Sequence, residues 1–224
     1  MSLYIISTPI GNLQDITFRA IETLKQSDII LAEDTRRTFI LLNHYNIENK
    51  KLTSFNDFNK EKKSNYIINE LKQNKNISIV SDSGTPGISD PGFYLVRECV
   101  RNNIQVIPIP GPTAAISALV SSGFPTDSFV FYGFIPKKEK AKTDFFNEIK
   151  NNNKTTIIYE SPYRLIKTLK IMSEIIPNRE ICIARELTKK FEELIRGKVK
   201  EIYEKLKDKN IKGEITITIN KADN

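Results

Sequence analysis

The stretch from Ser81 to Gly92 reads SDSGTPGISDPG, and it decides the fold that we expect. It follows the apolar run 77–80, which predicts a buried strand, and it precedes an amphipathic pattern over 93–100 that predicts a helix. A loop in this position lies at the carboxyl end of a strand, where open α/β sheets bind ligands. All of its residues except Ile88 are Gly, Pro, Ser, Thr or Asp, which is more than an ordinary strand-to-helix turn requires. We therefore interpret it as a ligand-binding loop, in which glycines admit a ligand close to the backbone and prolines stiffen the chain.

The end of the same stretch predicts how the following helix begins. Asp90 is a residue type that caps helix N-termini, and Pro91 is favoured in the first helical turn. We therefore expect the loop to run directly into a helix, with Asp90 as its cap.

Apolar runs alternate with helical patterns on both sides of this loop. We expect strands at 3–7, 28–32, 52–54, 77–81, 105–109, 128–134, 155–160, 180–185 and 213–220, with helices at 17–25, 35–45, 61–73, 92–102, 112–120, 141–151, 162–176 and 198–207. This rhythm is typical of an α/β fold with a parallel sheet. A polar connector at 121–127 separates two such series. We predict an N-terminal α/β lobe over 1–116 and a C-terminal α/β lobe over 117–224.

Unusual loops follow several of the predicted strands. In the first lobe these are TPIGNLQD at 8–15, EDTRRT at 33–38, the loop already described and PGPT at 110–113. In the second lobe they are YESPYR at 159–164 and RELTKKFEE at 185–193, the latter with a solvated helix start as the alternative. Because each loop follows a strand, we expect those of one sheet to gather at the same edge.

Net charge, the lengths of apolar stretches and the two cysteines limit the kinds of protein that this chain can be. The net charge of +7 permits a polyanionic partner such as RNA, although a Lys- and Asn-rich composition alone can also produce it. No apolar stretch approaches the length of a membrane span, and the first residues begin a strand without a leader, so we expect a cytoplasmic protein without membrane contact. Cys99 and Cys182 lie in apolar segments and predict neither a disulfide nor a metal site.

The motifs of common cofactor sites are absent from the sequence. It contains neither the dinucleotide-binding G-x-G-x-x-G after its first strand nor a P-loop, and its single histidine, His44, cannot build a histidine metal site or a strand-end catalytic triad. We expect no metal.

In its motifs the chain resembles the small-subunit ribosomal RNA 2′-O-methyltransferases, a branch of the tetrapyrrole methylase superfamily. The matching segments are STPIGNL at 7–13, EDTR at 33–36, the whole of 81–92, PGPTA at 110–114, YESPYR at 159–164 and ARELTK at 184–189. They occur in order along almost the whole chain. Many members carry a further C-terminal extension beyond the segment matching 213–220, and we expect any RNA contacts of that extension to be absent here or supplied elsewhere.

This resemblance implies a fold of two α/β lobes with a donor site in the cleft between them, distinct from the Rossmann-like methyltransferases. It implies S-adenosylmethionine as the methyl donor, a homodimer, and 16S ribosomal RNA within the small ribosomal subunit as the partner. The reaction implied is 2′-O-methylation of a cytidine ribose in the decoding region. By motif position, the residues that contact the donor are Pro9, Gly11, Asp82, Gly84, Thr85, Thr113, Ala114, Tyr159, Glu160 and Leu187.

Transfer of a methyl group to a hydroxyl needs an acceptor for the hydroxyl proton. A carboxylate or a neutral lysine can serve, and the candidate catalytic residues are Glu186, Glu160, Asp34 and Lys189. Guanidinium groups pair with phosphate through forked hydrogen bonds, so the expected RNA-binding residues are Arg36, Arg37, Arg164 and Arg185. The run 137–142 predicts an exposed basic loop that either grips phosphate or is merely solvated. Phe39, Tyr159 and Tyr163 are possible stacking surfaces for a base, or core residues.

Two other functions remain open from the sequence. C-methylation of a tetrapyrrole, a planar polyacid, is compatible with the fold and with the basic charge. A non-catalytic RNA-binding module for ribosome assembly is compatible with the charge, but it would not need the loop at 81–92.

Overall fold

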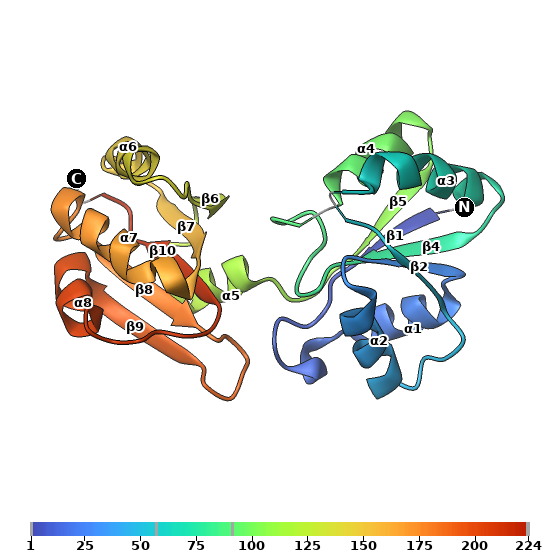
Figure 1. Ribbon diagram of the computed structural model, residues 1–224, viewed down its shortest axis with the longest axis horizontal. Coiled ribbons are helices and arrows are strands. Elements are labelled where there is room, and N and C mark those ends of the chain that lie inside the picture. The colour runs from blue at the N-terminus through green and yellow to red at the C-terminus, as the bar shows by residue number, and fades with distance from the viewer. Residues whose placement is uncertain (1, 57, 91, 223–224) are drawn as a thin grey trace. The chain divides into compact units, whose positions relative to one another are not determined.

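The computed structural model describes residues 2–56, 58–90 and 92–222. The chain divides into two compact units, Met1–Thr113 and Ala114–Asn224, and each has its own sheet and its own hydrophobic core (Figure 1). We call them the first and the second unit. The α/β class predicted from the sequence is confirmed. In the part of the chain that is described, no helix is long and apolar enough to span a bilayer.

The first unit contains a five-stranded sheet among its described residues. Its strands are β1 (Ser2–Ile6), β2 (Ile29–Ala32), β3 (Lys51–Ser54), β4 (Asn76–Val80) and β5 (Gln105–Ile109). The order is β3-β2-β4-β1-β5, and all neighbouring pairs are parallel. The strands are rich in Ile, Leu and Val because both faces of such a sheet are covered.

Helices cover both faces of this sheet. One core joins α3 (Lys60–Lys72) and α4 (Phe93–Arg101) to residues such as Leu31 and Ile79, and the other joins α1 (Phe18–Gln26) and α2 (Thr35–His44) to residues such as Ile30 and Val80. Figure 1 shows the two helix pairs on opposite sides of the strands. A short 3₁₀ helix, Leu13–Asp15, precedes α1.

The strand order identifies the place in this sheet where a ligand would bind. Strands β1 and β4 are neighbours, but the chain leaves β1 through α1 toward β2 and leaves β4 through α4 toward β5. The two connections cover opposite faces and run in opposite directions, which makes this pair of strands a topological switch point. Ligands of open α/β sheets bind beyond the carboxyl ends of strands at such points. The loops that follow β1 and β4 are therefore the candidate site of the first unit.

The second unit has a mixed sheet in the described part of the chain. Its strands are β6 (Phe129–Phe134), β7 (Thr155–Glu160), β8 (Glu180–Arg185), β9 (Glu193–Lys198) and β10 (Ile215–Ile219), in the order β6-β7-β10-β8-β9. β6 and β7 are parallel, whereas β10 runs antiparallel to both β7 and β8. Ile215 of β10 pairs with Glu160 and with Arg185, so the carboxyl ends of β7 and β8 lie at the same edge.

The helices of the second unit divide between two clusters. The main core joins α6 (Glu139–Ile149), α7 (Pro162–Ile175) and α8 (Val199–Leu206) to the sheet, and a small cluster joins α5 (Ala114–Ser122) to Ile157. Most predicted boundaries lie within two residues of the observed ones, but the sequence analysis placed no strand at β9. That edge strand buries Ile195 and little else, so its apolar pattern is short and interrupted by charges.

Candidate functional site

Hydrogen bonds join the strand-end loops of the first unit. Thr8 and Gly84 exchange two backbone hydrogen bonds, with N···O distances of 2.8 and 3.1 Å, which form an isolated antiparallel bridge between the loops after β1 and β4. The hydroxyls of Ser7 and Thr85 lie 2.8 Å apart. The Thr85 hydroxyl also lies 3.2 Å from the carbonyl oxygen of Pro112, in the loop after β5. The expected gathering of these loops at one edge is therefore confirmed.

The packing of these loops depends on glycine at two positions. Gly84 has a φ of +83°, a conformation that residues with a side chain rarely adopt. A Cβ atom on Gly111 would lie 2.8 Å from the Cβ of Ser7, so only glycine lets the loop after β5 lie against the end of β1. The glycines of these loops thus position backbone as well as leaving room for a ligand.

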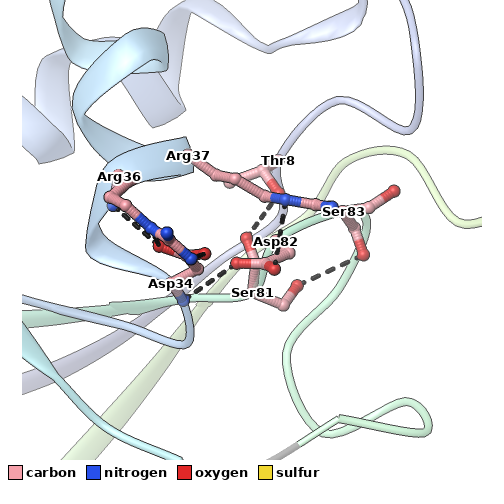
Figure 2. A network of polar contacts seen from close by, with 7 residues as sticks. All are labelled: Thr8, Asp34, Arg36, Arg37, Ser81, Asp82 and Ser83. Atoms are coloured by element: carbon pink, nitrogen blue, oxygen red, sulfur yellow. Dashed lines mark hydrogen bonds and ion pairs between the residues drawn. The ribbon is translucent and has the colours of Figure 1, made fainter.

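Four charged side chains line the edge at the ends of β2 and β4 (Figure 2). The carboxylate of Asp82 accepts a hydrogen bond from the backbone N–H of Asp34 at 2.9 Å, which ties the two loops together. Arg36 donates to both carboxylate oxygens of Asp34, at 3.0 and 2.6 Å, and these hydrogen bonds lower the pKa of Asp34 to about 2. Arg37 extends toward Asp82, with an Nε–Oδ2 distance of 3.6 Å.

Asp90 lies near the charges of the candidate site, although the sequence predicted it only as a helix cap. The helix that follows begins at Phe93 with Gly92 as its N-cap, so the prediction that Asp90 caps the helix is wrong, and Pro91 lies outside the described residues. Burial, together with the nearby charges of Glu33 and Asp82, raises the pKa of Asp90 to about 7 although a hydrogen bond with Ser81 opposes the shift. The signal available in the sequence was a second aspartate in the loop that already contains Asp82.

The residues at this edge suit a cationic ligand with a small polar end. S-adenosylmethionine carries a sulfonium and an ammonium group, and the carboxylate of Asp82 is the group at this edge that attracts such charges. The turn at Gly84 leaves backbone without a side chain at this edge, and the neighbouring Thr85 hydroxyl is hydrogen-bonded to Ser7 and to Pro112. The residues at this edge therefore fit S-adenosylmethionine. Within the described ranges no group of three or more His, Cys, Asp and Glu side chains could hold a metal ion.

Glu160, at the carboxyl end of β7 in the second unit, is buried, accepts three hydrogen bonds and forms an ion pair with a further cation. Its Oε1 accepts from Arg164 Nη2 at 2.6 Å and from the Ser161 N–H at 2.7 Å. Its Oε2 accepts from the hydroxyl of Thr168 at 2.5 Å and lies 3.6 Å from Lys142 Nζ. This arrangement suits an anchoring carboxylate better than a group that takes a proton from a substrate, because neither oxygen faces solvent.

Lys142 differs from the sequence-based expectation. The run 137–142 was expected to be exposed throughout, but Lys142 is only 3% exposed and donates a 2.6 Å hydrogen bond to Thr168. Burial lowers its pKa, while the Glu160 charge opposes that effect. Lys137, Lys138 and Lys140 are exposed, as expected.

Glu186 and Lys189 belong to a closed network after β8. Glu186 Oε1 accepts from the backbone N–H of Glu214 at 2.8 Å and from Lys189 Nζ at 3.0 Å. The hydrogen bond from Glu214 is the main reason that the pKa of Glu186 is lowered. Burial lowers the pKa of Lys189, but its bonds to Glu186 and Glu214 outweigh that effect and raise it overall. Glu186 has a φ of +51°, and a Cβ on Gly213 would lie 2.3 Å from its Cγ.

The remaining predicted residues lie at the expected edges of their own units. In the first unit Pro9 is buried and Gly11 exposed after β1, and Thr113 is half-buried after β5. In the second unit Ala114 begins α5, Leu187 is half-buried after β8, and the ring of Tyr159 packs edge-on against Phe131 at 5.0 Å. Arg185 Nε lies 3.1 Å from Glu193 Oε2 across the β8–β9 pair.

Known proteins resemble this chain over nearly its full length. Residues 2–203 match the family model described as Tetrapyrrole (Corrin/Porphyrin) Methylases. The Ribosomal RNA small subunit methyltransferase I of Hydrogenobaculum sp. is 48% identical over 99% of this chain and 96% of its own length. The protein of the same name from Thermotoga maritima is 49% identical over 97% of each chain.

A solved structure shares the fold. The uroporphyrin-III C-methyl transferase of Thermus thermophilus, complexed with S-adenyl homocysteine, superposes with a TM-score of 0.65 at 14% identity, over 98% of this chain and 97% of its own. The fold, the loops at the switch point and the extent of these matches all support the same family assignment. The chain belongs to the tetrapyrrole methylase family and, within it, to the group of the ribosomal RNA small subunit methyltransferases I.

Proposed function

We propose that this protein transfers a methyl group from S-adenosylmethionine to the ribose 2′-hydroxyl of a cytidine in the decoding region of 16S ribosomal RNA, within the small ribosomal subunit. The observation that carries the proposal is the identity of 48–49%, over almost the whole chain, to proteins named for methylation of small-subunit ribosomal RNA. The choice of cytidine and of the 2′-oxygen rests on the motif resemblance. We also propose that the enzyme acts as a homodimer.

The residues proposed to hold the donor come mainly from the switch point of the first unit. Asp82 and Thr85 supply a charge and a hydroxyl, and Gly84 lets the backbone approach the ligand. The other proposed contacts are Pro9, Gly11, Thr113, Ala114, Tyr159 and Leu187. Glu160, whose side chain is 0% exposed, is proposed instead to anchor the loop after β7. When bound, the donor supplies a sulfonium-activated methyl group that needs no metal to react.

The proton of the 2′-hydroxyl requires an acceptor whose pKa lies near the working pH. Asp90, with a pKa of about 7, meets this requirement, and we propose it as the general base ahead of the residues chosen from the sequence. Asp34 is a weaker base because Arg36 lowers its pKa to about 2. Glu186 is held by two donors with a lowered pKa, and the pKa of Lys189 is raised, which keeps that amine protonated.

The arginines differ in how free they are to bind RNA phosphate. The side chains of Arg36 and Arg37 are 87% and 63% exposed, so each can exchange its present carboxylate for a phosphate at small cost. Arg164 and Arg185 are each 23% exposed and are engaged with Glu160 and Glu193. We therefore propose direct phosphate contacts for the first pair, and a role for the second pair in ordering the loops after β7 and β8.

The test is mass spectrometry of nucleosides from small subunits that lack the modification, incubated with labelled S-adenosylmethionine and the protein. Labelled 2′-O-methylcytidine is the expected product. Asp82→Ala should abolish donor binding, measured by calorimetry, and with it the label. The matched control is Glu22→Ala, which removes a 61% exposed carboxylate that forms a surface ion pair with Lys25.

Each other outcome contradicts part of the proposal. Donor binding without any label on RNA or on subunits would indicate a small-molecule methylase. Absence of donor binding by the unaltered protein would indicate an assembly factor. Full methylation by Asp82→Ala would place the donor elsewhere.

A further inference from the structure

The positive charge of this protein is concentrated in the second unit. Residues 1–113 contain 13 Lys and Arg against 12 Asp and Glu, whereas residues 114–224 contain 21 against 15, so the second unit carries +6 of the net +7. Electrostatic attraction to a polyanion follows the local charge density within about 10 Å rather than the total charge of the chain. A surface that binds RNA backbone is therefore to be sought on the second unit.

Parallel strands place two basic segments of this unit at one edge. β6 and β7 are neighbours and run in the same direction, so the segments that follow them leave the sheet side by side. β6 leads to Lys137, Lys138 and Lys140 at the beginning of α6, and β7 leads to the first turns of α7. Helices α6 and α7 also pack against each other.

A buried network fixes these two segments together. Glu160, the last residue of β7, is in contact with Lys142 from the first turn of α6 and with Arg164 and Thr168 from α7. Burying three charged groups is costly, and such a network persists only when its members are mutually satisfied. The consequence is a rigid edge on which the exposed side chains of both helices keep a fixed spacing.

The exposed side chains at this edge have the chemistry of an RNA-binding surface. Tyr163 is 93% exposed at the beginning of α7. Lys167 and Lys170 are exposed four and seven positions later, so they share its face of the helix. Glu139 is the one carboxylate within the basic segment from Lys137 to Lys140.

We propose that this surface, the basic edge formed by Lys137, Lys138, Lys140, Tyr163, Lys167 and Lys170, binds the RNA substrate, with the lysines on phosphates and the tyrosine ring stacked on an unpaired base. The inference rests on the proposed function, and it adds which part of the chain takes up the RNA. Lysines neutralise phosphates and exposed aromatic rings stack on bases in proteins that bind single strands. A second copy of this chain is a poorer occupant, because a two-fold interface would set lysines against lysines.

The test compares two triple variants that remove the same charge. Lys137→Gln/Lys138→Gln/Lys140→Gln alters the basic edge. Lys150→Gln/Lys154→Gln/Lys221→Gln is the control, because its lysines are exposed at the opposite edge, where β7 begins and β10 ends. Binding of each variant to unmethylated small subunits and to a fluorescent RNA hairpin with the decoding-region sequence is measured as a function of salt.

The edge variant should bind about tenfold more weakly at about 0.1 M salt, and its plot of log affinity against log salt should be shallower by about 2. Tyr163→Ala should weaken binding by about fivefold or more with the slope unchanged, whereas Tyr163→Phe should bind normally. Donor affinity should remain that of the unaltered protein in all four variants.

Equal losses in the edge and control variants would overturn the inference, since binding would then follow total charge. Unchanged RNA affinity with an altered sedimentation coefficient would assign the surface to self-association. Failure of the unaltered protein to bind or methylate either RNA would overturn the proposed function together with the inference.

Discussion

The most informative single residue at the candidate site is Asp90, because burial and nearby negative charge raise its pKa to about 7. Asp34 is an equally acidic residue type at the same edge, but the guanidinium of Arg36 keeps it ionised. Asp90 is partly removed from water and feels the negative charges of Glu33 and Asp82, and both conditions favour the protonated form and raise its pKa. A group that exchanges its proton near neutral pH at little cost suits general base catalysis.

Asp90→Asn tests this assignment through two opposing effects. Methylation should fall by about a hundredfold or more, because the amide cannot take a proton. Stability should rise at pH 8 by on the order of 1 kcal/mol, after allowing for solvent screening at this partly exposed side chain, because the variant no longer carries a disfavoured charge.

The sign of the stability effect follows from the pKa values. The pKa of Asp90 is raised from 3.8 to about 7 in the folded state, so its contribution to stability is fully present below about pH 4 and is lost as the pH rises through about 7. The gain from Asn should therefore vanish near pH 4. Thermal unfolding at several pH values measures this stability gain. An Asp90→Asn variant with normal methylation and no pH-dependent gain in stability would refute the role of Asp90 as general base.

At the scale of elements, the second unit shows how a sheet edge is held by charge. α6, β7 and α7 meet at Glu160, which shares its carboxylate between the cations of Lys142 and Arg164. Removal of the carboxylate leaves two buried or half-buried cations facing each other, whereas removal of one cation leaves the other pair intact.

Glu160→Gln should therefore destabilise the protein more than Lys142→Met. We expect a loss of about 3 kcal/mol for the first and about 1 kcal/mol for the second, measured by urea unfolding. The double variant should be less destabilised than the sum of the two, because the unpaired Lys142 is then absent. A larger loss for Lys142→Met would mean that Arg164 contributes little to the network.

Strands that are buried along most of their length could be predicted from the sequence, whereas an edge strand with few buried residues could not. The runs of β4 and β7 are buried over most of their length and were placed within one residue. β9 was missed because it is an edge strand, and the β8–β9 connection of seven residues, 186–192, is too short for a parallel crossover and forces an antiparallel pair. The cap of α4 was misplaced because the helix begins only at Phe93, after Gly92, and the side chain of Asp90 is hydrogen-bonded with Ser81 instead.

The loops of the candidate site could be predicted for a related reason. Gly and Pro at 84–87 and 110–112 mark positions where the backbone must turn. Such turns can be predicted from the sequence because these two residue types have distinctive backbone conformations. Protonation and side-chain partners could not be predicted, because they depend on residues far apart in sequence, such as Asp34 with Asp82 and Lys142 with Glu160. The motif resemblance indicated where the candidate site lies, while the contacts of its individual side chains became visible only in the fold.

At the scale of the whole molecule, the two units have separate hydrophobic cores and separate sheets. Their chemistry is also divided, since the acidic edge at the switch point lies in the first unit and most of the net charge lies in the second. Damage to one core should therefore remain local, because the apolar residues of each core come from one unit alone.

Hydrogen exchange measured by mass spectrometry tests this division with one variant in each unit. Gly111→Ala places a Cβ 2.8 Å from Ser7 and should speed exchange in peptides from 1–113, while Glu160→Gln should speed it in peptides from 114–224. Each variant serves as the control for the other. Faster exchange across both units in either variant would contradict this division and show that the chain opens as one cooperative body.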